Sequence, residues 1–341
     1  MRQHQFKKTF PNESAVRDKL TNLWDDDSAT KIKNLKVSED SDMSAFEYYV
    51  SLRNKIIICV GLLIVISFFV NAFTLLLITL YLIVIYLGIL LFKWYRFSPQ
   101  YIATVNEFLF PKLFSVFDLE GEHTHVRKSS QLKNSIIALL DDSQLITEPR
   151  NRTKMDNYFI TKVYNTKCEM TEMEIKHVSG SGKNRQVKRI FKGIFVSYQL
   201  PVVLEGRTFI STRGDSQGFG HTSFWRSVTG GASLQETKME WNQFNKQIRV
   251  ATTNPTEARY ILTPAFMSDL YDWWHEKKVN IRISFIADHM YILFPDRTMF
   301  INQALSPFSL DTKKLQDYVM KTAVPFMHTL HLIEDIRVRF R

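Results

Sequence analysis

The residues best suited to chemistry lie in the stretch at 254–266, which reads NPTEARYILTPAF. It holds a carboxylate, a guanidinium and a phenol within four positions, at Glu257, Arg259 and Tyr260. Side chains of these types act as general acids and bases when they converge on one substrate. Glu257 and Arg259 are two positions apart, however, and residues at that spacing do not face each other along a helix. The stretch could therefore build the fold instead of an active site.

Helix-capping rules favour the structural interpretation of this stretch. Asn254 suits an N-cap, Pro255 suits the first helical position, and Glu257 stands where the carboxylate of a capping box reaches back to the cap. Thr263 and Pro264 repeat the cap and proline for a second helix. The sequence thus predicts two consecutive helix starts and no catalytic residue here.

A second candidate is the glycine-rich segment at 214–231, GDSQGFGHTSFWRSVTGG, which holds five of the twelve glycines. Aromatic side chains flanked by arginine can stack on a ligand or on a partner peptide. The candidate binding residues are Arg213, Phe219, His221, Trp225 and Arg226. The alternative is a long loop that packs on a sheet. A further alternative is that the protein is an enzyme in which His221 lies above a cleft.

A third candidate is the basic stretch at 178–189, VSGSGKNRQVKR. A phosphate-binding loop of the form GxxxxGK[ST] would need glycine at 177 and Ser or Thr at 184, but these are His177 and Asn184. We expect a polar hairpin loop instead. Its basic cluster could contact an anionic leaflet, where each such residue contributes about 1 kcal/mol, or could be a solvated strand edge. The cluster comprises Lys183, Arg185, Lys188, Arg189 and Lys192.

Metal-ligating and nucleophilic patterns are weak in this sequence. EGEHTH at 120–125 offers closely spaced Glu and His residues, but no second ligand motif accompanies it. The acids at 269–276 share a helix whose apolar stripe includes Leu270 and Trp273, so we expect them on its solvated face. No nucleophile and base motif occurs. We therefore expect no metal and no cofactor, and catalysis is not favoured.

The strongest signal is the run from Ile56 to Phe92, which is 37 residues long and carries no charge. A bilayer core of about 30 Å needs roughly 20 helical residues, whereas one helix of this length would reach about 55 Å. We predict two spans at 56–71 and 73–92 that turn near Asn71. The run contains no Asp, Glu, His, Lys or Arg, so the hairpin is expected to anchor the chain and not to form a pore.

Charged residues frame this predicted hairpin on both sides, with Arg53 and Lys55 before it and Lys93 and Arg96 after it. The positive-inside bias then places both ends in the cytoplasm. The whole chain carries 44 Lys and Arg against 34 Asp and Glu, a formal charge of +10, which suits proximity to an anionic surface. Its two cysteines exclude a disulfide framework. We expect a multi-pass protein of a bacterial inner membrane with both termini cytoplasmic.

The rest of the chain divides by its hydrophobic pattern. We predict a polar N-terminal segment at 1–52, the transmembrane hairpin at 53–97, a helical connector at 98–150 and a cytoplasmic domain at 151–341. Strand patterns occur at 158–164, 170–177, 189–200, 207–212, 235–241 and 246–252, followed by helical 255–277, a hairpin turning at 287–289, and a final helix with a kink at Pro325. Strands followed by helices predict an α+β fold with an antiparallel sheet.

Part of this domain resembles the bacterial DUF3137 family. The pattern Phe244-x3-Ile248-x-Val250 followed by EARYILTPxFM at 257–267 is similar to that family's signature, and the segments at 191–195 and 206–209 resemble its sheet. The resemblance covers about residues 145–335 and implies an architecture without an established activity. Asn254 stands where the family usually carries Asp, which keeps the cap and disfavours a catalytic acid there.

These patterns together favour a membrane-anchored, non-enzymatic binding or scaffold protein whose cytoplasmic domain contacts a protein partner or the lipid surface. One alternative is a membrane-tethered enzyme with its site near the 214–231 loop. Another is a binder of anionic lipid or of nucleic acid through the basic cluster at 183–192, with nucleic acid as the least favoured partner.

Overall fold

The computed structural model describes residues 10–23, 45–68, 81–92, 106, 109–126, 129–181, 184–215, 234–277, 280–295 and 312–337. The chain divides into two compact units. The first contains residues 1–18, 113–300 and 320–341, and the second contains residues 19–112 and 301–319. Lys183, Phe219, His221, Trp225 and Arg226 lie outside the described residues, as does the predicted turn at Asn71.

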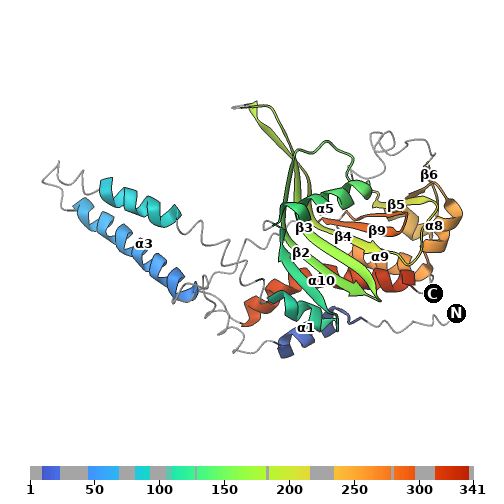
Figure 1. Cartoon of the computed structure of the whole chain (residues 1–341), viewed down its shortest axis with the longest axis horizontal. Coiled ribbons are helices and arrows are strands. Elements are labelled where there is room, and N and C mark those ends of the chain that lie inside the picture. The colour runs from blue at the N-terminus through green and yellow to red at the C-terminus, as the bar shows by residue number, and fades with distance from the viewer. Residues whose placement is uncertain are drawn as a thin grey trace. The chain divides into compact units, whose positions relative to one another are not determined.

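An antiparallel sheet dominates the first unit (Figure 1). Nine strands of the described residues form it in the order β1-β2-β3-β4-β9-β8-β5-β7-β6. Their bounds are β1 Gly121–His125, β2 Arg152–Val163, β3 Thr166–Ser179, β4 Gln186–Gln199, β5 Arg207–Thr212, β6 Gln235–Glu236, β7 Ile248–Thr252, β8 Arg282–Ile286 and β9 His289–Pro295. This sheet, with a helix at its C-terminal end, confirms the predicted α+β class.

Helices α8 and α9 lie within the predicted helical range 255–277, whereas α3 begins well before the span predicted at 56–71. Their bounds are α1 Glu13–Leu23, α3 Ala45–Phe68, α5 Ser130–Asp142, α7 Asn242–Gln247, α8 Pro255–Ile261, α9 Pro264–Lys277 and α10 Thr312–Arg337. The hydroxyl of Ser129 caps α5 by accepting a hydrogen bond of 3.2 Å from the backbone N–H of Leu132. Pro325 lies inside α10.

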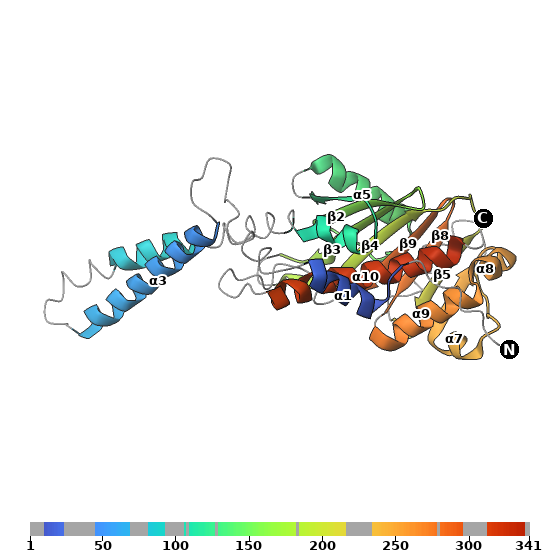
Figure 2. The same ribbon diagram turned by 90° about the horizontal axis from the view of Figure 1, so that it is seen from below.

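Helices cover both faces of the sheet, with α5 on one face and α9 and α10 on the other (Figure 2). On the α5 face, the rings of Phe195 and Tyr291 stack 6.0 Å apart. On the opposite face, Trp273 of α9 lies 3.9 Å from the ring of Phe294. Because both faces are covered, the central strands are buried almost continuously and do not alternate with solvent.

The second unit contains a helical hairpin formed by α3 and a helix at residues 81–92. Leu52 and Cys59 of α3 pack against Leu90 of the second helix. Many of the other apolar side chains point outward, including Ile58 at 61% exposure and Tyr81 at 67%. None of the described helices combines the length and the mean hydropathy that a bilayer-spanning helix requires.

Several elements differ from the sequence prediction; β2, for example, begins at Arg152 instead of 158. Three further differences have a local explanation. The first is β1, whose sequence GEHTH contains no hydrophobic residue and so gives no strand pattern. The second is β6, which ends at Glu236 although a strand to 241 was expected. The third is α7, which has six residues and a single buried side chain, Phe244. A helix this short shows no period that could be detected.

Candidate functional site

The stretch at 254–266 forms two helix starts, as predicted. The Asn254 side chain accepts a hydrogen bond of 3.2 Å from the Glu257 N–H at the start of α8. The Thr263 hydroxyl accepts one of 3.1 Å from the Phe266 N–H at the start of α9. Pro255 and Pro264 are the first residues of these helices.

The capping box expected for Glu257 is wrong, because its carboxylate binds elsewhere. One carboxylate oxygen accepts a hydrogen bond of 3.0 Å from the Glu205 N–H, and the other accepts one of 2.8 Å from the Gly206 N–H. These are backbone groups of the turn that precedes β5. Charge-assisted bonds of this kind are stronger than neutral ones, so Glu257 fixes that turn against α8.

The three groups with a catalytic appearance do not converge. Glu257 is engaged with backbone N–H groups, whereas Arg259 is exposed on α8. Tyr260 beside it is 46% exposed. This arrangement assigns the stretch to architecture, in agreement with the sequence argument.

Around the glycine-rich segment, the described residues form a cluster of charged and polar residues, which we call the loop base: Arg213, Asp215, Glu236, Asn245, Arg249 and Arg282. Arg213 donates a hydrogen bond of 2.6 Å to the Asn245 carbonyl and another of 2.6 Å to the Glu236 carboxylate. Arg249 lies 3.3 Å from the same carboxylate. The residues that enter and leave the segment are therefore tied together.

The strongest contact of the loop base is a buried ion pair between Arg282 and Asp215. The guanidinium donates to both carboxylate oxygens, at 2.5 and 3.0 Å, and to the Leu145 carbonyl at 3.2 Å. The two side chains are only 9% and 4% exposed. Arg282 was not among the candidate residues, because it alternates with Ile281 and Ile283, a pattern typical of an outward-facing position in a strand. Burial follows from α5 and the segment after it, which cover this face of β8.

Aromatic side chains gather at the N-cap of α7 and on α9, next to the loop base. The Tyr271 ring lies 4.9 Å from that of Trp241 and 5.7 Å from that of Trp274, and all three side chains are half-buried. Asn245 of α7 connects this cluster to the loop base through its bond to Arg213. Nothing in the sequence had linked Trp241 to Tyr271, because their contact depends on how α7 folds back.

The basic cluster lies on the end of the β3–β4 hairpin, which we call the hairpin arm: residues 174–181 and 184–192. The two strands continue past their neighbours (Figure 1). The register with β2 ends at Arg152 opposite Lys176, and the register of β4 with β9 ends at Gly193 opposite Pro295. Arg185, Lys188 and Arg189 are exposed on the arm, and Lys192 is half-buried.

Acidic residues meet some of these cations at the root of the hairpin arm. Glu174 lies 3.0 Å from Arg189 and 2.7 Å from Lys176, and Lys188 lies 2.8 Å from Glu148. Burial acts to raise the pKa of Glu174, but the hydrogen bonds and charges of Lys176 and Arg189 outweigh it, and the pKa is lowered. Glu174 is thus held as a carboxylate.

The histidines of the EGEHTH segment join a polar network on the sheet. His123 lies 3.0 Å from the Asn157 side chain, whose amide donates a hydrogen bond of 2.7 Å to the buried Glu172 carboxylate. The rings of His123 and His125 are 5.1 Å apart. Within the described ranges, no group of three or more His, Cys, Asp or Glu residues could hold a metal ion.

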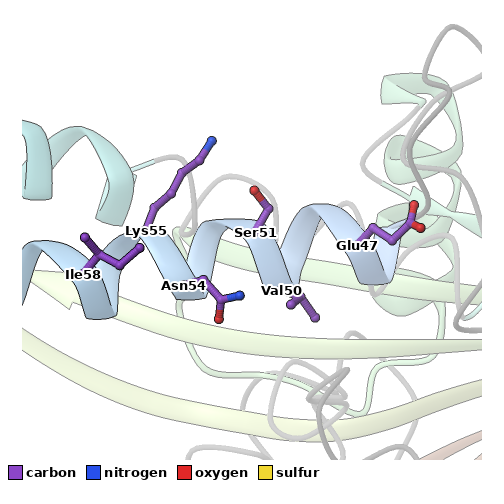
Figure 3. Close-up of a pocket in the computed structure, with 6 residues that line it drawn as sticks. All are labelled: Glu47, Val50, Ser51, Asn54, Lys55 and Ile58. Carbon is purple, nitrogen blue, oxygen red and sulfur yellow. The ribbon is translucent and has the colours of Figure 1, made fainter.

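A depression beside α3 is the pocket shown in Figure 3. Its lining residues all belong to this helix, and they are Glu47, Val50, Ser51, Asn54, Lys55 and Ile58. Side chains from a single helix face give no convergent set of groups for catalysis. We assign no site to it.

The fold and these surfaces define an α+β domain with an open antiparallel sheet, accompanied by a helical hairpin. Residues 189–336 match the family described as "Protein of unknown function (DUF3137)", and the chain carries a DUF3137 domain there. This confirms the resemblance, over a shorter range than the 145–335 expected from the sequence.

A solved structure shows a weak similarity to this chain. The crystal structure of the mycobacterial trehalose monomycolate transport factor A, TtfA, is 7% identical to this chain and has a TM-score of 0.31. The similarity covers 66% of this chain and 93% of that one. No curated protein matches the chain.

Proposed function

We propose that the chain is a membrane-anchored protein whose α+β domain binds a partner and does not catalyse a reaction. The proposal of a membrane anchor is supported by the distribution of exposed hydrophobic side chains. Of the sixteen large hydrophobic side chains exposed among the described residues, thirteen lie on α3 and at 81–92. Exposed apolar surface on this scale is typical of a membrane or protein contact.

The sequence of the hairpin supports a lipid contact. The uncharged run at 56–92 is continuous in the sequence, and residues 69–80 within it lie outside the described part of the chain. Basic residues at both ends favour an orientation with both termini in the cytoplasm of a bacterial cell. The DUF3137 domain would then work at the inner face of the inner membrane.

The loop base supports a binding role for the domain. Arg213, which precedes the glycine-rich segment, is hydrogen-bonded to Glu236, which follows it, and Asp215 pairs with Arg282. Side chains that are already ordered lose less entropy on binding. The half-buried Trp241, Tyr271 and Trp274 beside the loop base are residue types that dominate protein interfaces. We therefore infer a protein partner at this end of the sheet.

Alkaline carbonate washing of membranes that contain the full chain tests the anchor. We expect the chain to stay in the membrane pellet, and Leu62→Arg combined with Val84→Arg should release it, because charges at these positions oppose insertion. The matched control is Val203→Arg, another exposed valine, which should not release it. Release of the unmodified chain would overturn the anchor. A reporter fused after Arg341 should be cytoplasmic, and a periplasmic reporter would overturn the orientation.

The partner site is tested by crosslinking in intact membranes. If the partner binds through aromatic contacts, the complex should persist at high salt. The crosslinks should be lost in Trp225→Ala and retained in Val203→Ala. If Trp225→Ala leaves every crosslink unchanged, the glycine-rich segment is not the binding surface.

A further inference from the structure

The hairpin arm is a two-stranded projection of the sheet. Beyond Arg152 on one side and Gly193 on the other, the described residues continue as a two-stranded ribbon. Asn151 braces it, because its side chain accepts a hydrogen bond of 2.9 Å from the Val178 N–H and donates one of 2.7 Å to the Val178 carbonyl. Both bonds imitate the backbone of a third strand. The ribbon is thereby held in an extended conformation.

An apolar pair lies near the end of the hairpin arm. Val178 of β3 stands opposite Val187 of β4 in the register, so the two side chains share a face. Val187 is 52% exposed. In the described part of the sheet unit, Val203 and Tyr260 are the other large hydrophobic residues exposed to a similar extent. An exposed Val187 beside a half-buried Val178 at the end of a ribbon has little structural benefit.

Positive charge surrounds this apolar pair. From 174 to 192 the sequence has six basic residues and one acidic residue, a net charge of +5 in a chain of +10. Lys176 and Arg189 face each other in the register on the side of the two valines, whereas Lys188 lies on the opposite face. Charge on both faces suits a ribbon that enters a charged layer end-on. A nucleic acid would be bound better by cations gathered on one face.

We propose that the hairpin arm inserts into the headgroup layer of an anionic phospholipid membrane. Val178 and Val187 would reach the boundary with the acyl chains, while Arg185, Lys188 and Arg189 contact lipid phosphates. The inference rests on the proposed membrane anchor, because tethering keeps the arm at high local concentration near lipid. The hairpin arm would give the protein a second membrane contact, and this contact would depend on the lipid composition of the membrane.

The test places a fluorophore at the end of the arm in the full chain. Val187→Cys is labelled with an environment-sensitive dye, and the protein is reconstituted in phosphatidylcholine vesicles with or without phosphatidylglycerol. Cys59 and Cys168 are buried, so the unsubstituted chain measures background labelling. We expect a blue shift and a several-fold loss of iodide quenching only when phosphatidylglycerol is present. The control is Val203→Cys, which should stay accessible to iodide in both vesicles.

Charge reversal separates the arm from general electrostatics. Arg185→Glu, Lys188→Glu and Arg189→Glu together should abolish the response of the dye at 187. Reversal of three exposed lysines elsewhere, Lys133, Lys162 and Lys238, should preserve it. Because the triple variant removes the Arg189–Glu174 and Lys188–Glu148 contacts, a thermal melt accompanies it. If that variant has lost its fold, the dependence on lipid composition in the unsubstituted background decides the question.

The outcomes distinguish this inference from the proposed function. A dye at 187 that stays quenched in anionic vesicles, while the chain resists carbonate extraction, overturns the arm contact and leaves the anchor in place. Extraction of the chain by carbonate overturns the anchor itself. If free phosphate abolishes the response at constant ionic strength, the site binds small anions and not a membrane. Protection of the dye by an oligonucleotide, without protection by phosphatidylglycerol, would assign the arm to nucleic acid.

Discussion

Glu257 and Gly206 are in direct contact across the start of α8, since the Gly206 N–H donates a hydrogen bond of 2.8 Å to the Glu257 carboxylate. A side chain at position 206 would occupy the same space. Its Cβ would lie 2.6 Å from the Cβ of Asn254 and 2.8 Å from the carboxylate oxygen. The glycine and the helix cap are therefore one structural unit, although 51 positions separate Glu257 from Gly206.

Gly206→Ala is expected to destabilise the domain by about 1–3 kcal/mol, the usual cost of overpacking a filled site. The measurement is a thermal or denaturant unfolding curve of the full chain. The matched control is Gly214→Ala, because no atom lies within 4 Å of a Cβ built there. Equal stability of the two variants would contradict the close approach at Gly206.

Arg282→Met is expected to cost about 3–5 kcal/mol, because it leaves the Asp215 carboxylate buried without its cation. The double variant Arg282→Met with Asp215→Leu should recover most of that loss, since it removes both charges. Denaturant unfolding of the single and double variants forms the measurement.

The control for the buried pair is the exposed contact between Arg213 and Glu236, whose side chains are 31% and 36% exposed. Arg213→Met should cost about 0–1 kcal/mol, as for other surface ion pairs. If Arg213→Met and Arg282→Met prove equally costly, burial does not determine the strength of the Arg282 contact.

The sequence predicted well those elements whose signals are local. Asn254 and Pro255 are sufficient to place the start of α8, because capping depends on neighbours within four residues. The strand at 207–212 has the predicted bounds. By contrast, the partner of Glu257 is a turn about fifty residues away, and no local rule selects it over a capping box.

The candidate site was less accessible to sequence reasoning. The positions of Arg185, Lys188 and Arg189 on a hairpin follow from their polar loop. The projection of the hairpin past the sheet, however, depends on where the neighbouring strands β2 and β9 end. Arg282 was missed for a similar reason, since its burial depends on α5 and Leu145, elements distant in the chain. Contacts set by tertiary packing leave no periodic trace in a single sequence.

The stability of the hairpin arm should depend on pH through Glu174. Its pKa is lowered in the folded chain by Lys176 and Arg189, which outweigh the effect of burial. A depressed pKa in the folded state contributes stability above the unfolded pKa, and this contribution is lost as the pH falls through the folded value. Glu174→Gln should therefore be less stable than the unsubstituted chain at neutral pH and equally stable in acid. Thermal unfolding as a function of pH measures the difference, and a constant difference into acid would contradict it.

Cys168 should resist thiol reagents while the sheet is intact. Burial, with a smaller effect of the neighbouring Glu169 charge, raises the pKa of its thiol to about 12. The reactive thiolate is therefore scarce at neutral pH, and access is also blocked because the residue is fully buried. Mass spectrometry after iodoacetamide treatment should show Cys168 unmodified in the folded chain and modified in denaturant. A variant with an added cysteine at the exposed Val203 provides the positive control, since it should react in both states. Rapid modification of Cys168 in the native chain would mean that β3 opens readily between β2 and β4.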